Sequence, residues 1–282
     1  EPRRHAPRRP LGREGGVPAG FWPEAGIVAA CLAVLLGLSL NSSLRGHRRA
    51  TGWIGCASLT LLIALFIGYP HLNDFDQGLS ALVQEHRSAW LDETMVRLTQ
   101  LGEFKNMFVA SALFTGLLLL ARQWRHALFV GITLGMAAVI NTATKLFFAR
   151  GRPEILTDPL SSFSMPSGHS SGAFAFFLAL AVLAGRGQPT RLRLTWLLLG
   201  CIPAAFIALS RVYLGVHWPT DILAGMLLAM SVCTLSLGAI QYRSPLPPMS
   251  QKAWWLVLPA LVAVLGFIAF SDTSQALFKY AY

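Results

Sequence analysis

The sequence predicts an all-α protein whose helices form a polytopic transmembrane bundle. Of its 282 residues, 54% are hydrophobic and only 13% are charged, whereas soluble domains carry roughly 25% charged residues. Eight separate stretches, each roughly 16 to 21 residues long, contain no Asp, Glu, Lys or Arg, and such lengths suit a hydrocarbon core about 30 Å thick. Because lipid offers no hydrogen-bond partner to an open backbone, we expect each stretch to be a helix. This composition excludes a soluble protein with a single core.

The eight uncharged stretches follow one another along the chain with charged connections between them. In order they cover residues 25–44, 52–70, 106–121, 127–144, 169–185, 194–210, 222–241 and 253–271. The third and fourth are joined only by residues 122–126, so we expect a tight antiparallel hairpin there. Two longer connections remain, over residues 71–105 and 145–168.

The first long connection contains a segment, from Phe75 to Leu101, with the pattern of a surface helix. Charged residues occur throughout it, and its apolar residues recur close to the i, i+4, i+7 spacing of one helical face. This pattern predicts an amphipathic helix that lies in the outer membrane interface. The alternative is a solvated loop that covers the end of the bundle.

The charged connections differ strongly between the two faces that eight crossings define. One face carries ten basic residues and no acidic one: Arg45, Arg48, Arg49, Arg122, Arg125, Arg186, Arg191, Arg193, Arg243 and Lys252. The positive-inside rule makes this face cytoplasmic and therefore predicts a multi-pass protein of the cell (inner or plasma) membrane. The Arg- and Pro-rich tail, residues 1–24, falls on the opposite face, so the crossing at residues 25–44 conflicts with the rule.

Other features of the composition indicate no separate function. The net charge of +10 does not predict nucleic-acid binding, because no basic run is interleaved with aromatic residues. The four cysteines lie in apolar stretches without a CxxC pair, which favours buried free thiols. Gly131 and Gly135 form a GxxxG pattern, which favours close packing inside the bundle over dimerisation and leaves the oligomeric state open.

Polar residues that membranes normally exclude gather at the ends of the fourth to seventh stretches. They are Lys145, Arg152, Ser167, Gly168, His169, Ser210, Arg211, His217 and Asp221. Because consecutive spans are antiparallel, the end of one and the start of the next lie at the same membrane surface, and by charge count this surface is the outer one. Three cations brought together need an anion, and the planar fork of Arg matches phosphate oxygens. The N-terminus of a helix at Gly168 adds backbone N–H donors for the same anion.

The two histidines supply the nucleophile and the proton donor that phosphoryl transfer needs. Asp221 lies four residues after His217, so its carboxylate can accept from one ring nitrogen and leave the other as a nucleophile that forms a phosphohistidine. His169 is placed to protonate the leaving oxygen. Taken singly, Lys145 or Arg211 could extend to lipid headgroups and Asp221 could cap a helix. Those roles predict no particular spacing, whereas the observed residues converge on one face.

The spacing of these residues resembles a three-part signature. Lys145 precedes Arg152-Pro153 by six intervening residues, Pro166-Ser167-Gly168-His169 follows, and Ser210-Arg211, His217 and Asp221 complete it. This pattern is similar to that of the type 2 phosphatidic acid phosphatase (PAP2) family. The resemblance implies a six-helix core over residues 52–241, with extra spans at 25–44 and 253–271.

The resemblance also implies a role for each signature residue and no need for a metal or other cofactor. It implies that Lys145, Arg152 and Arg211 form a phosphate clamp to which Ser167, Gly168 and Ser210 add hydrogen bonds. His169 would be the general acid, His217 the nucleophile and Asp221 its orienting partner. Arg150 lies outside the signature, and we expect it to contact only lipid headgroups.

The combined prediction is a membrane phosphatase that acts on a lipid phosphate. The resemblance allows phosphatidate, phosphatidylglycerol phosphate, an isoprenyl diphosphate such as undecaprenyl diphosphate, or lipid A, and an outward-facing site favours the isoprenyl diphosphate. A phosphotransferase that passes the phosphoryl group to an acceptor lipid would use the same residues. A lipid-phosphate transporter is the alternative without catalysis, and it predicts paired charges within the spans. The notable polar residues within a span are instead Asn141, Thr142 and Thr144.

Overall fold

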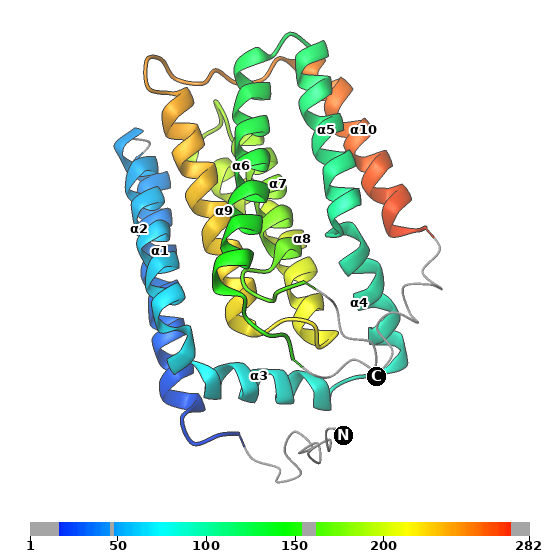
Figure 1. The fold of residues 1–282 in the computed structure, drawn as a ribbon. Coiled ribbons are helices and arrows are strands. Elements are labelled where there is room, and N and C mark those ends of the chain that lie inside the picture. Colours follow the sequence, from blue (N-terminus) through cyan, green and yellow to red (C-terminus); the bar gives the residue numbers. More distant parts are fainter. Residues whose placement is uncertain (1–16, 46–47, 154–161, 272–282) are drawn as a thin grey trace.

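The computed structural model describes residues 17–45, 48–153 and 162–271, which form ten α-helices and one short 3₁₀-helix. The helices are α1 (Phe21–Arg45), α2 (Arg48–Gly68), η1 (Tyr69–His71), α3 (Asn73–Glu85), α4 (Ala89–Leu101), α5 (Phe104–Leu120), α6 (Trp124–Phe148), α7 (Gly168–Ala184), α8 (Thr190–Tyr213), α9 (Pro219–Ile240) and α10 (Gln251–Ala269). The described residues contain no strand, which confirms the all-α prediction. Figure 1 shows a bundle of roughly parallel helices with α3 lying across one end.

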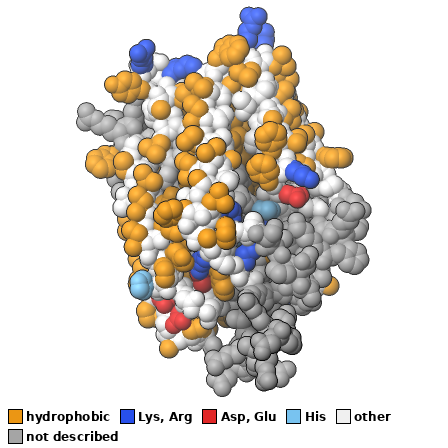
Figure 2. All heavy atoms as spheres, in the orientation of Figure 1, with side chains coloured by type: hydrophobic (Ala, Val, Ile, Leu, Met, Phe, Trp, Pro, Cys, Tyr) orange, Lys and Arg blue, Asp and Glu red, His pale blue; other side chains and the backbone are white. Residues whose placement is uncertain are grey.

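The lengths of these helices suit a multi-pass membrane protein. All eight uncharged stretches are helical, and five helices are long and apolar enough to cross a membrane: α2 with η1, α6, α8, α9 and α10. The bent pair α4–α5 makes a sixth candidate, while α7 and the first part of α1 are apolar but shorter. Hydrophobic side chains cover the sides of the bundle in Figure 2. The predicted polytopic bundle is therefore confirmed.

Helix α7 lies at the centre of the bundle. Ten of its 17 residues are buried, and it packs against α5, α6, α8 and α9. Small residues allow this close approach. At Gly200 of α8, an added Cβ would lie 2.8 Å from both the Cβ of Ala181 and the carbonyl oxygen of Phe177 on α7. This contact fixes the spacing between α7 and α8.

The predicted close packing at Gly131 and Gly135 is wrong. An added Cβ at Gly135 would have no heavy atom within 4 Å, and one at Gly131 would meet only Thr115, at 3.6 Å. Both glycines therefore lie where α6 has room for a larger side chain.

The predicted single helix from Phe75 to Leu101 is two helices, α3 and α4, so that prediction is corrected. The break lies at Ser88, whose backbone N–H donates to the hydroxyl of Tyr213 at 3.1 Å. The side-chain amide of Gln84 donates to the carbonyl oxygen of the same tyrosine at 2.9 Å. The end of α8 thus interrupts the surface helix. A second break follows, because α4 and α5 meet at an angle of 47°.

At the end opposite α3, the connection between α9 and α10 is fastened to the start of α6. Arg125 donates three hydrogen bonds to carbonyl oxygens between Ile240 and Pro245, at 2.7 to 3.0 Å. His126 lies 2.8 Å from the carbonyl oxygen of Pro247 through its Nε2. Lys and Arg side chains gather at this end in Figure 2. These contacts fix where α10 enters the bundle.

Candidate active site

The starts of α7 and α9 meet at the end of the bundle that α3 covers. Ser167 is the N-cap of α7, and its hydroxyl oxygen accepts from the backbone N–H of Ser170 at 3.4 Å. Its own backbone N–H donates to the carbonyl oxygen of Asp221 at 3.0 Å. At Gly225, one turn further along α9, an added Cβ would lie 2.8 Å from the carbonyl oxygen of Ser167. The two helix starts are therefore held together by a backbone contact and close packing.

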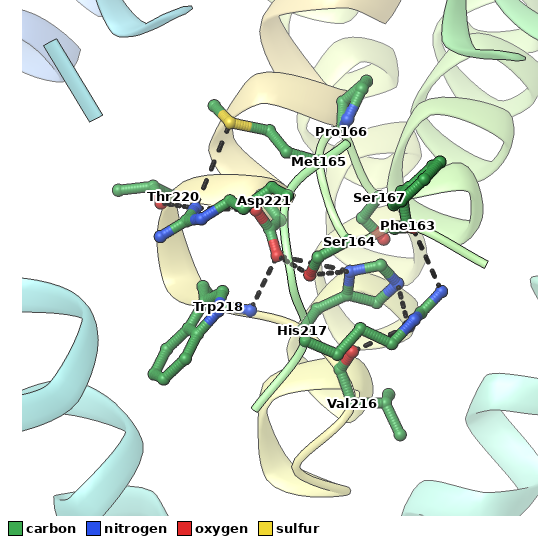
Figure 3. A network of polar contacts seen from close by, with 12 residues as sticks. Phe163, Ser164, Met165, Pro166, Ser167, Val216, His217, Trp218, Thr220 and Asp221 are labelled. Carbon is green, nitrogen blue, oxygen red and sulfur yellow. Dashed lines mark hydrogen bonds and ion pairs between the residues drawn. The ribbon is translucent and has the colours of Figure 1, made fainter. Parts of the chain in front are cut away.

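His217 lies in the short connection between α8 and α9 and is only 2% exposed. Its Nε2 lies 3.1 Å from Nη1 of Arg152. Because a guanidinium can only donate, Nε2 must be the accepting nitrogen and the ring proton lies on Nδ1. Nδ1 lies 3.3 Å from the hydroxyl oxygen of Ser164 and 3.4 Å from Oδ2 of Asp221. Figure 3 shows the ring between these groups.

Asp221, the third residue of α9, is fully buried and uses both carboxylate oxygens. Oδ2 accepts from the backbone N–H of Trp218 at 2.8 Å and from the hydroxyl of Ser164. Oδ1 accepts from Nη1 of Arg150 at 2.8 Å. The carboxylate therefore caps α9 and contacts Nδ1 of His217 at the same time.

Burial keeps His217 neutral. It lowers the pKa of the ring to about 3, because the charged imidazolium loses its hydration. Asp221 opposes this effect, whereas the positive charges of Arg152 and Arg211 add to it. At neutral pH, Nε2 is therefore unprotonated, and its lone pair accepts from the guanidinium of Arg152.

The three predicted cations lie around this histidine, and each is held by oxygen atoms of the protein. Lys145 donates to the carbonyl oxygens of Phe163 and Ser164, at 2.5 and 3.3 Å. Arg152 donates to the carbonyl oxygens of residues 162 and 216, both at 2.7 Å. Arg211, only 2% exposed, donates to the hydroxyl of Thr99 at 2.6 Å. The segment before α7 is thus the shared anchor of Lys145 and Arg152.

The other predicted site residues lie at the neighbouring helix ends. His169 is in the first turn of α7, against the break between α4 and α5. An added Cβ at Gly102 in that break would lie 3.0 Å from Cδ2 of His169. Gly168 begins α7. The hydroxyl of Ser210 donates to the carbonyl oxygen of Ile207 at 2.7 Å, within its own helix.

Sequence reasoning missed two groups at this site. The prediction that Arg150 contacts only headgroups is wrong, because it forms ion pairs with Asp76 at 2.7 Å and Asp221 at 2.8 Å. Ser164, between Lys145 and His217, was also missed. The sequence contained one indication of the ion pair with Arg150. Asp76 follows Phe75 on the apolar side of the amphipathic pattern, where a buried carboxylate needs a cation. Nothing in the sequence indicated the position of Ser164.

The described residues contain no group of three or more His, Cys, Asp or Glu side chains placed to hold a metal ion. The predicted site residues that carry a positive charge are Lys145, Arg152 and Arg211. These are the side chains available to bind an anion at this site.

Comparison with known proteins identifies the family. The model of the PAP2 superfamily matches residues 126–245, which include every predicted site residue. The putative undecaprenyl-diphosphatase YbjG of Escherichia coli (strain K12) is 32% identical over 177 residues, which cover 57% of this chain and 85% of that relative. The chain belongs to the PAP2 superfamily.

Other PAP2 relatives agree with this assignment. Phosphatidylglycerophosphatase B of Bacillus subtilis (strain 168) is 29% identical over 184 residues, covering 63% of this chain and 89% of that relative. The crystal structure of a transmembrane PAP2-type phosphatidylglycerolphosphate phosphatase from Bacillus subtilis has the same fold, with a TM-score of 0.60 and 24% identity, covering 67% of this chain and 97% of that one. This PAP2 protein is a membrane phosphatase that hydrolyses phosphoric esters.

Proposed function

We propose that the protein hydrolyses a phosphomonoester or diphosphate of a membrane lipid through a phosphohistidine on His217. The observation that carries this proposal is the contact of 3.1 Å between Nη1 of Arg152 and Nε2 of His217. It places the lone pair of a neutral imidazole next to a side chain suited to phosphate oxygens. The proposed nucleophile and an anion-binding group thus lie next to each other.

In the first step, Nε2 attacks phosphorus, and the bond between phosphorus and the leaving oxygen breaks. The ring becomes positively charged, and the carboxylate of Asp221 stabilises it through Nδ1–H. His169 donates a proton to the leaving oxygen, an effect worth roughly 10² to 10⁴ in rate. Water then attacks phosphorus and gives a proton to His169, and the P–Nε2 bond breaks, which releases phosphate and returns His217 to its neutral form.

The phosphate clamp of Lys145, Arg152 and Arg211 neutralises the charge on the transferring group. When substrate binds, Lys145 exchanges carbonyl contacts for phosphate oxygens. Arg152 exchanges its contact with Nε2 of His217 for a phosphate oxygen, which frees the lone pair of Nε2. Ser167, Gly168 and Ser210 add hydrogen bonds from the ends of α7 and α8. Since these three cations supply the electrostatic stabilisation, the reaction proceeds without a metal.

The proposed substrate keeps its tail in lipid while its phosphate enters the site. Two observations support an amphiphile: the sides of the bundle are apolar, and the site lies at a bundle end that α3 covers (Figure 1). The charge count supports an extracytoplasmic location for this end of the bundle. Relatives are named for phosphatidylglycerol phosphate and undecaprenyl diphosphate, and an outward-facing site favours an isoprenyl diphosphate.

The domain arrangement that accompanies this function is a catalytic core over residues 52–241. The spans at residues 25–44 and 253–271 flank it as additions. The family match, over residues 126–245, lies almost wholly within this core.

The test is a phosphate-release assay on purified protein with phosphatidate, phosphatidylglycerol phosphate, undecaprenyl diphosphate and lipid A, each in excess chelator. We expect release from at least one lipid without any acceptor lipid, inhibition by vanadate, and loss of release in His217→Ala. His126→Ala, which changes a histidine at the opposite end of the bundle, is the matched control and should retain activity. A release that requires an acceptor would indicate a phosphotransferase, and a loss in chelator that Mg²⁺ restores would contradict the metal-free mechanism.

The covalent step needs its own measurement. Brief reaction with ³²P-labelled substrate followed by an alkaline quench should leave label on the protein, because the N–P bond of phosphohistidine survives alkali and breaks in acid. If the wild-type protein carries no label under these conditions, direct attack by water on the substrate would be favoured.

A further inference from the structure

Arg150 lies between two buried carboxylates that come from distant parts of the chain. Its Nη2 donates to Oδ2 of Asp76 on α3 at 2.7 Å, and its Nη1 donates to Oδ1 of Asp221 on α9 at 2.8 Å. Both carboxylates have an exposure of 0%, and the arginine side chain has 11%. The guanidinium thus bridges α3 and α9 at the base of the site.

Aromatic rings on two sides hold the same guanidinium in place. Its Cζ lies 4.7 Å from the ring centroid of Tyr69 and 5.7 Å from that of Trp218. The indole N–H of Trp218 donates to the carbonyl oxygen of Gly151, next to Arg150, at 3.2 Å. Arg150 is therefore fixed by ion pairs and rings together.

Asp76 makes a second, direct contact with the start of α9. Its Oδ1 accepts from the backbone N–H of Thr220 at 2.8 Å, and its Oδ2 accepts from the hydroxyl of Thr220 at 2.6 Å. An acidic side chain at a helix N-terminus is favoured by the free N–H groups there. Asp76 therefore fixes the turn of α9 that carries Asp221.

The two carboxylate oxygens of Asp221 contact different partners. Oδ2 faces Nδ1 of His217, while Oδ1 is occupied by Arg150. Without Arg150, two carboxylates would lie buried near each other with no cation between them, and one would tend to take a proton. A protonated or rotated Asp221 would no longer present an anionic oxygen to His217.

We propose that Arg150 and Asp76 are positioning residues for the reaction. Arg150 keeps Asp221 ionised, Asp76 anchors Arg150 and the start of α9, and together they keep Oδ2 of Asp221 directed at Nδ1 of His217. This inference rests on the proposed function, because it assigns Asp221 a task in the chemistry. The network also makes α3 part of the catalytic apparatus rather than only a helix at the membrane interface.

The test compares Arg150→Gln with Asp221→Asn and the double variant. We expect Arg150→Gln to lower kcat by about 10- to 100-fold, as losses of supporting partners often do, with little change in KM. In the Asp221→Asn background, the same substitution should have almost no further effect, because groups that act through one another are not additive. Arg87→Gln removes another largely buried arginine, paired with Asp92, and should leave kcat unchanged.

A spectroscopic measurement keeps the test decisive if the slow variants approach the detection limit. ¹H NMR should show the Nδ1–H proton of His217 shifted downfield in wild type by its contact with the carboxylate of Asp221, and shifted back upfield in Arg150→Gln and Asp76→Asn. A purely structural role would lower the unfolding temperature without moving this signal.

Two outcomes would overturn the inference: multiplicative losses in the double variant, or an unchanged Nδ1–H signal in Arg150→Gln. Failure of the proposed function has a different signature. If Asp221→Asn alone retained full activity, the role of Asp221 would be wrong, whatever Arg150 does.

Discussion

At the scale of single residues, burial determines the protonation state of His217. A ring with a pKa of about 3 stays neutral at pH 5, where an ordinary histidine, with a pKa near 6.5, is mostly charged. We expect ¹⁵N NMR of the protein at pH 5 to show neutral His217 beside charged free histidine. A ring that is half protonated near pH 6.5 would contradict this.

The same pKa has a consequence for stability. The unfolded chain binds a proton on this histidine below pH 6.5, whereas the folded protein does not. Stability is therefore lost as the pH falls from about 6.5 toward 3, by roughly 1.4 kcal/mol for each pH unit from this group alone. His217→Asn should reduce this dependence in unfolding measurements between pH 4 and 7. An identical dependence in the variant would show that other groups cause it.

Gly102 lies between α4 and α5, next to His169 in the first turn of α7. An added Cβ would lie 2.5 Å from Cγ2 of Ile207 and 3.0 Å from Cδ2 of His169, so Gly102→Ala must displace one of them. A shift of about 1 Å in a catalytic group can cost about 10²-fold, and we expect a loss of kcat of that order. Gly116→Ala, in α5, meets nothing within 4 Å and serves as the control. Equal activity of the two variants would remove the steric argument.

At the scale of helices, α7 and α8 pack closely against each other at Gly200. Gly200→Ala brings a methyl group within 2.8 Å of the backbone carbonyl of Phe177, which cannot move away by a side-chain rotation. We expect a loss of about 1 to 3 kcal/mol in stability, as for other overpacked positions. Thermal unfolding in detergent measures it, and Gly135→Ala should be neutral or slightly stabilising. A loss at Gly135 equal to that at Gly200 would contradict the assignment.

The sequence predicted the helices well because a local property, the absence of charge, defines them. The grouping of Lys145, Arg152 and His217 was also predictable, since antiparallel spans place alternate ends together. The break at Ser88 was not predictable, because it depends on the hydroxyl of Tyr213, 125 residues away. The same holds for Arg150, whose partner Asp76 is 74 residues distant. Long-range polar contacts leave little trace in a single sequence.

At the scale of the whole molecule, the uneven charge predicts the orientation in the membrane. Single cysteines at Glu85, near the site, and at Gln188, between α7 and α8, lie at opposite ends of the bundle. In a variant whose four native cysteines are replaced, an impermeant thiol reagent added outside intact cells should label the Glu85→Cys protein only. A permeant reagent should label both. Labelling of Gln188→Cys alone would place the active site in the cytoplasm.

The connection that carries His217 is short and already ordered. It spans residues 214–218, and the backbone N–H groups of Val216 and His217 both donate to the carbonyl oxygen of Arg211, at 3.1 and 3.3 Å. A loop with so little freedom has little conformational entropy to lose when a ligand arrives. The energy of binding the phosphate group is therefore available for orienting the substrate rather than for folding the loop around it. If His217 acts as the proposed nucleophile, this preorganisation raises its effective concentration next to the phosphorus atom of a bound substrate.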